Sequence, residues 1–197
     1  AKFEKKLSEI TKAKYVLATN TVTSALHTAL TVSGVKQDTN VILSPLTFVA
    51  TANAIKYNNA IPIFIDCDKN NFCLCPNQLL FFLKNETFFK KKKRYFKKNK
   101  KEISAIIVTH VFGSTALINQ IVKIAKKFSI KLLEDSAESL GSYYKNKHLG
   151  TFGSIGVISF NGNKIISTGA GGAIITNSKK LYLTNYIDTN PYCEVAW

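Results

Sequence analysis

The chain has 197 residues, of which 46% are hydrophobic, and it carries a formal net charge of +15. This composition excludes an extensively disordered chain, because it supplies enough apolar surface to bury a core, and the length suits one α/β domain. No apolar run approaches the roughly 20 residues that a helix needs to cross a bilayer, and the first residues lack the apolar stretch of a signal peptide.

Hydrophobic periodicity predicts a helix near the N-terminus, where Phe3, Leu7 and Ile10 recur at helical spacing. Short apolar runs then alternate with longer helical patterns. Strands are expected at residues 15–18, 41–43, 61–66, 105–110, 131–135, 156–160 and 172–177. Helices are expected at residues 24–32, 47–57, 76–83, 116–128 and 178–187, and Pro76 occupies a favoured first-turn position.

This alternating order predicts an α/β fold with a mostly parallel, twisted sheet and helices on both faces. The expected strands are apolar throughout, as in strands that helices cover on both sides. We expect an N-terminal helix over residues 1–14 and one domain over residues 15–197. Ligands bind at the carboxyl ends of such strands, so Asp135, Glu134, His110 and the turn after Ala18 should converge on one edge of the sheet.

Residues 84–102 interrupt the alternation with a lysine-rich insertion that holds ten of the 27 basic side chains and two of the 12 acidic ones. Subtraction leaves 17 basic and 10 acidic residues elsewhere, so the net charge of the remaining chain is +7. Aromatic residues lie between these lysines, and such a run can bind nucleic acid. We favour a solvated surface hairpin or helical excursion, because no nucleic-acid-binding module accompanies the run.

The four cysteines, Cys67, Cys73, Cys75 and Cys193, form no CxxC pair and have no well-spaced histidine partner. This spacing disfavours a zinc site. We expect free thiols in a reducing compartment, which places the protein in the cytoplasm.

Three side chains supply the groups that a pyridoxal phosphate (PLP) site needs. Lys164, just past an apolar strand, offers an amine for a Schiff base; Ser159 offers a hydroxyl for the phosphate, and Asp135 a carboxylate for the pyridinium nitrogen. The alternatives are a surface lysine in a turn and an aspartate that caps a helix. Glu134 should point to the opposite side of its strand and is the weaker candidate.

The turn at residues 21–24 lies between a strand and a helix, where amide groups and the helix dipole attract an anion. Thr23 and Ser24 add hydroxyls to this proposed phosphate cradle, although helix capping is an alternative. Phe48 suits either a ring that stacks on the cofactor or a core aromatic. Two histidines, His27 and His110, remain ambiguous between structural and catalytic roles.

Together these segments resemble the DegT/DnrJ-type nucleotide-sugar aminotransferases, which are PLP enzymes. The resemblance is carried by TVTSALHTAL, VILSPLTFVATANAIKYNNAIPIFIDCD, AIIVTHVFG and LLEDSAESLGSYYKNKHLGTFGSIGVISFNGNKIISTGAGGAIITN. Two parts, EDSAESLGSYYKNKH and SFNGNKI, are most similar to the subgroup that aminates C4 of UDP-linked 4-keto-6-deoxy-N-acetylhexosamines, as in bacillosamine and legionaminic acid synthesis. Perosamine-type aminotransferases are close relatives of that subgroup.

The resemblance implies the large domain of a PLP fold type I enzyme, with a nucleotide sugar and glutamate as substrates in surface polysaccharide synthesis. It implies a homodimer, because the family builds its site across two subunits. By position, it assigns the Schiff base and proton transfer to Lys164 and the pyridinium contact to Asp135. Phosphate contacts would come from Ser159, Thr23 and Ser24, ring stacking from Phe48, and a polar contact near the cofactor from Glu138.

Family members are about twice as long as this chain, so we expect a truncated protein that lacks the small C-terminal domain. Val22 replaces a small residue of the family pattern, and Ala170 replaces a glycine or an acid. Ser114, Thr115 and Leu117 replace the His, Pro and Asp that commonly follow the strand before them. These departures leave open a second hypothesis, a catalytically inactive domain that binds PLP weakly or serves as a subunit.

Overall fold

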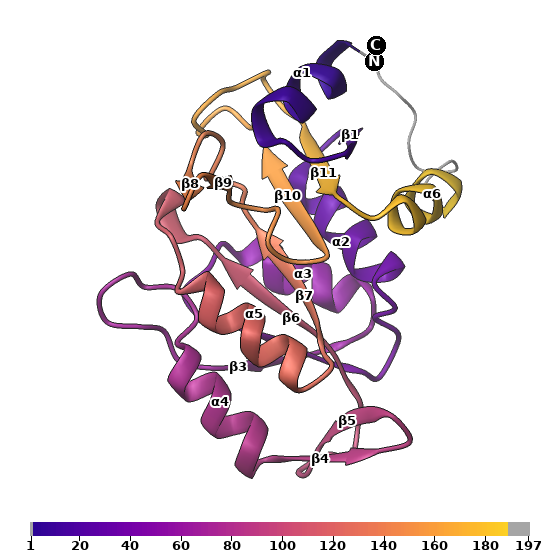
Figure 1. The fold of residues 1–197 in the computed structure, drawn as a ribbon. Coiled ribbons are helices and arrows are strands. Elements are labelled where there is room, and N and C mark those ends of the chain that lie inside the picture. The colour runs from indigo at the N-terminus through magenta and orange to yellow at the C-terminus, as the bar shows by residue number, and fades with distance from the viewer. Residues whose placement is uncertain (1, 189–197) are drawn as a thin grey trace.

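The computed structural model describes residues 2–188 and is built on a seven-stranded sheet with the order β1-β11-β10-β7-β6-β2-β3 (Figure 1). The strands are β1 (Tyr15–Thr19), β2 (Asn40–Leu43), β3 (Ile61–Phe64), β6 (Ile103–Thr109), β7 (Lys131–Asp135), β10 (Ile155–Ser159) and β11 (Gly172–Thr176). Neighbours from β10 to β3 pair in parallel, whereas β11 runs antiparallel to both β1 and β10. The predicted mostly parallel sheet is confirmed.

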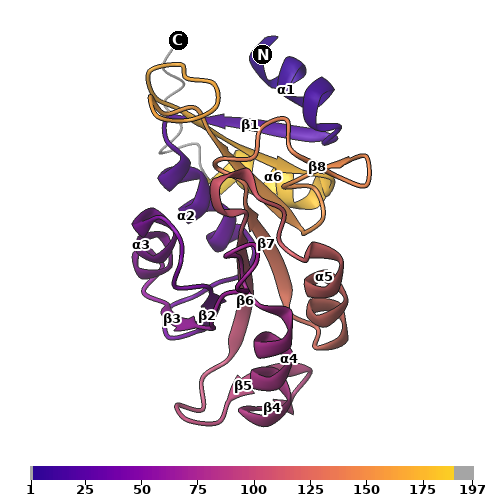
Figure 2. The ribbon, with the colours of Figure 1, turned by 90° about the vertical axis from the view of Figure 1, so that its left-hand side faces the viewer.

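Helices cover both faces of this sheet, as the view along its edge shows (Figure 2). One face is covered by α2 (Val22–Val32), α3 (Val49–Tyr57) and α6 (Lys179–Asp188), which belong to one apolar cluster with alternate strand residues such as Leu133 and Val157. The other face is covered by α1 (Lys2–Thr11), α4 (Pro76–Asn85) and α5 (Ile118–Lys127). Because helices cover both faces, strands such as β10 and β11 are buried along their whole length and are mostly apolar.

The lysine-rich segment forms a hairpin of β4 (Thr87–Lys90) and β5 (Lys93–Phe96), one of the two forms that we expected for a solvated surface excursion. Lys91 and Lys92 make its turn at φ values of 49° and 63°, a left-handed conformation that hairpin turns require and that glycine or asparagine usually supplies. The hairpin leads into the amino end of β6, so it lies away from the carboxyl edge of the sheet (Figure 1).

Three short elements were not predicted. They are the 3-10 turn η1 (Val111–Gly113) after β6 and the hairpin of β8 (Tyr143–Tyr144) and β9 (Lys147–His148) after β7. Strands of two residues are too short to show an alternating pattern, so the sequence carries no periodic signal for them.

Within residues 2–188, none of the helices has the length and apolar character that crossing a membrane would require. The same residues hold no group of three or more His, Cys, Asp or Glu side chains that could bind a metal ion. Cys67, Cys73 and Cys75 are free thiols, and burial raises the pKa of Cys73. Cys193 lies outside the described residues, as does the C-terminal end of the resemblance.

Candidate active site

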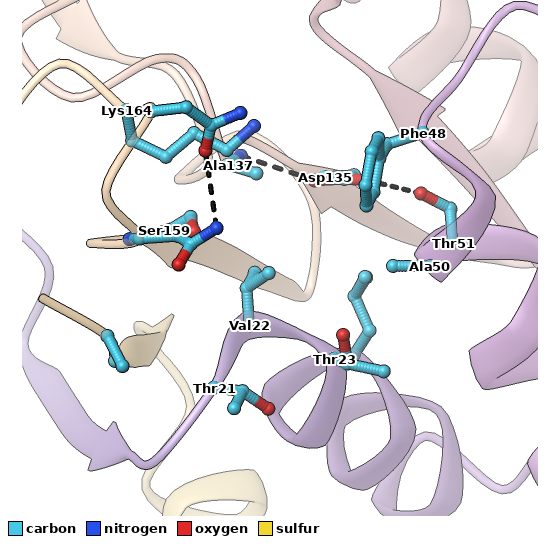
Figure 3. A pocket seen from close by; sticks show the side chains of 15 residues that line it. Thr21, Val22, Thr23, Phe48, Ala50, Thr51, Asp135, Ala137, Ser159 and Lys164 are labelled. Carbon is cyan, nitrogen blue, oxygen red and sulfur yellow. Dashed lines mark hydrogen bonds between the residues drawn. The ribbon is translucent and has the colours of Figure 1, made fainter.

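A pocket opens at the carboxyl edge of the sheet, between the first turns of α2 and α3 and the loop that follows β10 (Figure 3). Its lining includes five of the seven predicted site residues, namely Lys164, Asp135, Ser159, Thr23 and Phe48. They come from the carboxyl ends of β7 and β10, from two helix starts and from one loop. Asp135 and the turn that holds Thr23 thus lie at the edge where we expected the strand ends to converge, and Lys164, Ser159 and Phe48 line the same pocket.

Asp135 is the last residue of β7, and its side chain is buried among the residues of the pocket. Its Oδ2 accepts a hydrogen bond of 2.6 Å from the Thr51 hydroxyl, and its Oδ1 accepts one of 3.2 Å from the Ala137 amide. Burial raises the pKa of this carboxyl, while the hydrogen bonds and the charge of Lys164 act in the opposite direction. Because a turn rather than a helix follows, the helix-cap alternative is wrong.

Lys164 lies on the loop between β10 and β11. The base of this loop is closed by hydrogen bonds of 3.0 Å from the Phe160 amide to Gly171 O and from the Thr168 amide to Phe160 O. The side chain of Lys164 is 9% exposed, and its Nζ lies 2.7 Å from Oε1 of Glu138. The alternative of a solvated surface lysine is therefore wrong.

Phe48 caps the start of α3, and the residue is 67% exposed, so it is not a core aromatic. The Nζ of Lys164 lies 5.6 Å from the centre of this ring, within the range of a cation–π contact. Figure 3 shows Phe48 and Lys164 on opposite sides of the pocket.

The first turn of α2 forms another wall of the pocket with Thr21, Val22 and Thr23. Thr21 is the helix cap, because its hydroxyl accepts a hydrogen bond of 3.0 Å from the Ser24 amide. The close approach of this turn to β11 requires Gly172, where a Cβ atom would lie 2.7 Å from the Val22 nitrogen. The predicted cradle is thus placed at the pocket by backbone packing.

Two predicted site residues lie outside the pocket lining. Ser24 is in the first turn of α2, and its hydroxyl is 2.9 Å from that of Thr21. Glu138 contacts the pocket through its ion pair with Lys164, and its Oε2 accepts a hydrogen bond of 3.1 Å from the Phe112 amide. Glu138 therefore contacts the amine of Lys164, which we predict to be reactive, without lining the pocket itself.

Glu134 points away from Asp135, as expected from its neighbouring position on β7. Its side chain is bound by groups of the protein interior and not by the pocket. Its fully buried carboxylate accepts hydrogen bonds from His110 Nε2 at 3.0 Å, the Gly150 amide at 2.8 Å and the Gly153 amide at 2.5 Å. His110 therefore lies at the predicted edge but faces Glu134 and not the pocket. His27 packs its ring edge-to-face on Tyr57, with ring centres 6.0 Å apart, and is not among the pocket residues.

Some pocket residues were missed by sequence reasoning. Thr51 is the most informative, because it donates to the buried Asp135 carboxyl. Its position, one helical turn after Phe48, was a usable signal once both were placed on the same helix. Asn161 and Asn163 also line the pocket, and their side chains are joined by a hydrogen bond of 3.3 Å.

Comparison with known proteins gives an independent result. The model of the DegT/DnrJ/EryC1/StrS aminotransferase family matches residues 1–187. Among curated relatives, GDP-perosamine synthase of Escherichia coli O157:H7 is 39% identical over 92% of this chain and 45% of that protein. The UDP-4-amino-4,6-dideoxy-N-acetyl-beta-L-altrosamine transaminase of Campylobacter jejuni is 36% identical over 91% of this chain and 44% of that protein.

A solved structure of the same family supports this match. The DegT DnrJ EryC1 StrS aminotransferase of Brucella abortus matches with a TM-score of 0.85 and 32% identity, over 94% of this chain and 48% of that one. The chain therefore spans less than half the length of these relatives, and within that span the predicted PLP fold type I architecture is confirmed. The matched family model and the shared fold agree that the chain belongs to the DegT/DnrJ/EryC1/StrS aminotransferase family.

Proposed function

We propose that this chain forms the PLP-binding part of an aminotransferase that moves the amino group of glutamate to the 4-keto carbon of a nucleotide-linked 6-deoxy sugar. The observation that carries the proposal is that Lys164 and Asp135, 29 positions apart in the sequence, line one pocket at the carboxyl edge of the sheet. The names of the two curated relatives, a GDP-sugar synthase and a UDP-sugar transaminase, support a nucleotide sugar as acceptor. A role in polysaccharide synthesis is part of the proposal and is supported by the name of another relative, the spore coat polysaccharide biosynthesis protein SpsC of Bacillus subtilis, which is 31% identical over 91% of this chain.

The residues of the pocket fit PLP. A carboxylate has about four acceptor positions, and Asp135 uses two of them for Thr51 and Ala137, so it can accept a further hydrogen bond from a protonated ring nitrogen. That contact would stabilise the buried anion, which burial alone disfavours. The Ser159 hydroxyl and the first turn of α2 line the same pocket and suit a phosphate group.

When bound, PLP would supply an electron sink that stabilises negative charge on the substrate carbon from which a proton is removed. Lys164 would hold the cofactor through Nζ and carry that proton. Asp135 would keep the ring nitrogen protonated, and Phe48 would cover one face of the ring. Ser159, Thr23 and Ser24 would hold the phosphate, and Glu138 would act beside the amine of Lys164.

Exposed apolar side chains around the pocket support a homodimer. Phe48, Val49, Phe112, Ile165 and Ile166 are all more than half exposed, and Phe112 reaches 85%. A second copy of the chain would cover such a surface, and sedimentation velocity would detect the dimer. A cytoplasmic location is part of this proposal, since the three described cysteines are free thiols.

The second candidate, an inactive domain, is favoured by one observation: Val22 and Ala170 both line the pocket beside the proposed phosphate end. Val22 is larger than the small residue of the family pattern and could crowd a phosphate there, and Ala170 departs from the glycine or acid of that pattern. This candidate predicts weak PLP binding without turnover.

A turnover assay separates the two candidates. The purified 197-residue chain is incubated with PLP, glutamate and either a GDP- or a UDP-linked 4-keto-6-deoxy sugar, and the amino sugar and 2-oxoglutarate are quantified by mass spectrometry. The proposal predicts equal amounts of both products and their loss in Lys164→Ala. PLP binding with no amino sugar from either nucleotide class would favour the inactive domain.

A further inference from the structure

We infer that Glu138 is a positioning residue that holds the amine of Lys164 whenever this lysine is not bonded to the cofactor. The inference rests on the proposed function and adds a role for a carboxylate that the proposed chemistry leaves undefined. It starts from the ion pair between Lys164 Nζ and Glu138 Oε1, at 2.7 Å, in which the lysine side chain is 9% exposed and the glutamate side chain 33% exposed.

Glu138 is the fixed partner in this pair. Its second oxygen, Oε2, accepts a hydrogen bond of 3.1 Å from the amide of Phe112, which follows β6. Its own backbone packs against the same turn so closely that a Cβ atom at Gly113 would lie 2.6 Å from Glu138 O. Two contacts therefore hold the carboxylate, one through the side chain and one through the backbone.

Lys164 is the movable partner. Its amine sits on a flexible four-carbon stem, on a loop, between the Glu138 carboxylate and the Phe48 ring. To join an aldehyde, the ammonium releases one proton, and the neutral nitrogen then bonds to the aldehyde carbon. Its two remaining hydrogens leave with the aldehyde oxygen as water. The ion pair seen here is thus available to the free ammonium and is given up when the nitrogen is bonded.

This arrangement has a thermodynamic consequence. The pair stabilises every state in which Lys164 is free, which includes the empty chain and the chain with pyridoxamine phosphate (PMP), because PMP has no aldehyde. It does not stabilise the state in which Lys164 is bonded to PLP. Removing the charge of Glu138 should therefore favour PLP over PMP.

The test measures dissociation constants for PLP and PMP by equilibrium dialysis on the 197-residue chain, with and without Glu138→Gln. Glutamine keeps an oxygen that can accept from Phe112, so the turn is retained. We expect the ratio of the PLP constant to the PMP constant to fall by about fivefold, as for the loss of a partly buried ion pair. In the Lys164→Ala background the same substitution should leave this ratio unchanged, since no amine remains to be held.

A matched control is Glu102→Gln, which removes a Glu–Lys pair of the same length, 2.7 Å to Lys93, away from the pocket. It should change neither constant. Should circular dichroism show that Glu138→Gln does not fold, Glu138→Asp replaces it, because its shorter side chain keeps the charge but withdraws it from the amine, and the ratio should change in the same direction.

An unchanged ratio in Glu138→Gln, or an equal change with and without Lys164, overturns the inference while leaving the proposed function intact. Failure of the unsubstituted chain to bind either PLP or PMP overturns both.

Discussion

The hydroxyl of Thr51 donates a hydrogen bond of 2.6 Å to the buried carboxyl of Asp135, which joins the first turn of α3 to the end of β7. The Thr51 hydroxyl is also 2.9 Å from that of Thr47, which in turn is 3.0 Å from that of Thr109 at the end of β6. A row of three threonine hydroxyls therefore ends at the carboxyl that we propose to contact the cofactor ring, and it fixes the orientation of that carboxyl.

Substitution Thr51→Val should destabilise the protein by about 1–3 kcal/mol, because it leaves a buried carboxyl with one fewer donor. Valine keeps the volume of threonine, so the loss reports the hydrogen bond and not a cavity. Urea denaturation measures the change, and Thr51→Ser, which retains the hydroxyl, should recover most of it. Equal stability of the valine and serine variants would contradict this account.

The stability of the cofactor-free chain should depend on pH through Asp135. Burial raises its pKa above the ordinary value of 3.8, so between the two values the folded state binds more protons than the unfolded state. Stability from this group therefore falls as the pH rises through that window. Asp135→Asn removes the titration, and its stability relative to the unsubstituted chain should increase in urea denaturation as the pH is raised from about 4 through this window. A difference that stays constant or decreases over this range would refute the burial argument.

Much of the fold could be predicted because the sheet is covered on both faces. Burial on both sides favours short strands with apolar centres, and the pattern Lys-Leu-Leu-Glu-Asp at residues 131–135 predicts a strand with the bounds that β7 has. Helix ends were less accurate: the helix expected from residue 47 begins at Val49, with Phe48 as its cap. The hydrophobic pattern does not show at which residue this helix begins, because a cap residue without a hydrogen-bonding side chain carries no sequence signal.

The site was predicted in part. Lys164 follows a strand, and Asp135 and Ser159 end strands, so sequence reasoning could place all three near one edge of the sheet, where they line the pocket. The spacing from Phe48 could have placed Thr51 at the pocket, but its hydrogen bond to Asp135 and the pairing of Glu138 with Phe112 depend on how separate segments meet in space. The opposite orientations of Glu134 and Asp135 were predictable, because neighbouring residues of a strand face opposite sides of the sheet.

The glycine at position 172 should not tolerate a side chain. Gly172→Ala would place a Cβ atom 2.7 Å from the Val22 nitrogen and 2.8 Å from Thr21 backbone atoms, and it should cost about 1–3 kcal/mol of stability. Gly162→Ala is the matched control, since a Cβ atom at that position would meet no neighbouring group within 4 Å. The midpoint of thermal unfolding should be lower for Gly172→Ala than for Gly162→Ala. Equal midpoints would show that the close approach of Gly172 to Thr21 and Val22 does not exclude a side chain.

The hairpin turn offers a stabilising change. Lys92 has a φ of 63°, and a left-handed conformation costs a residue with a side chain about 1–2 kcal/mol. Lys92→Gly should therefore stabilise the protein by about 0.5 kcal/mol after the extra entropy loss of glycine is subtracted. Lys98→Gly removes the same charge from the same segment at a position that is not left-handed, and it should give no gain. Denaturation midpoints that rank Lys98→Gly above Lys92→Gly would contradict this explanation.

The most direct test of the central claim is to locate the residue that PLP modifies. The chain is incubated with PLP, reduced with sodium borohydride, digested and analysed by peptide mass spectrometry. We predict one dominant pyridoxyl label, on Lys164, and its loss in Lys164→Ala, although the chain has many exposed lysines that could react unselectively. A label spread over the surface lysines, with no preference for Lys164, would contradict the assignment of this pocket as a PLP site.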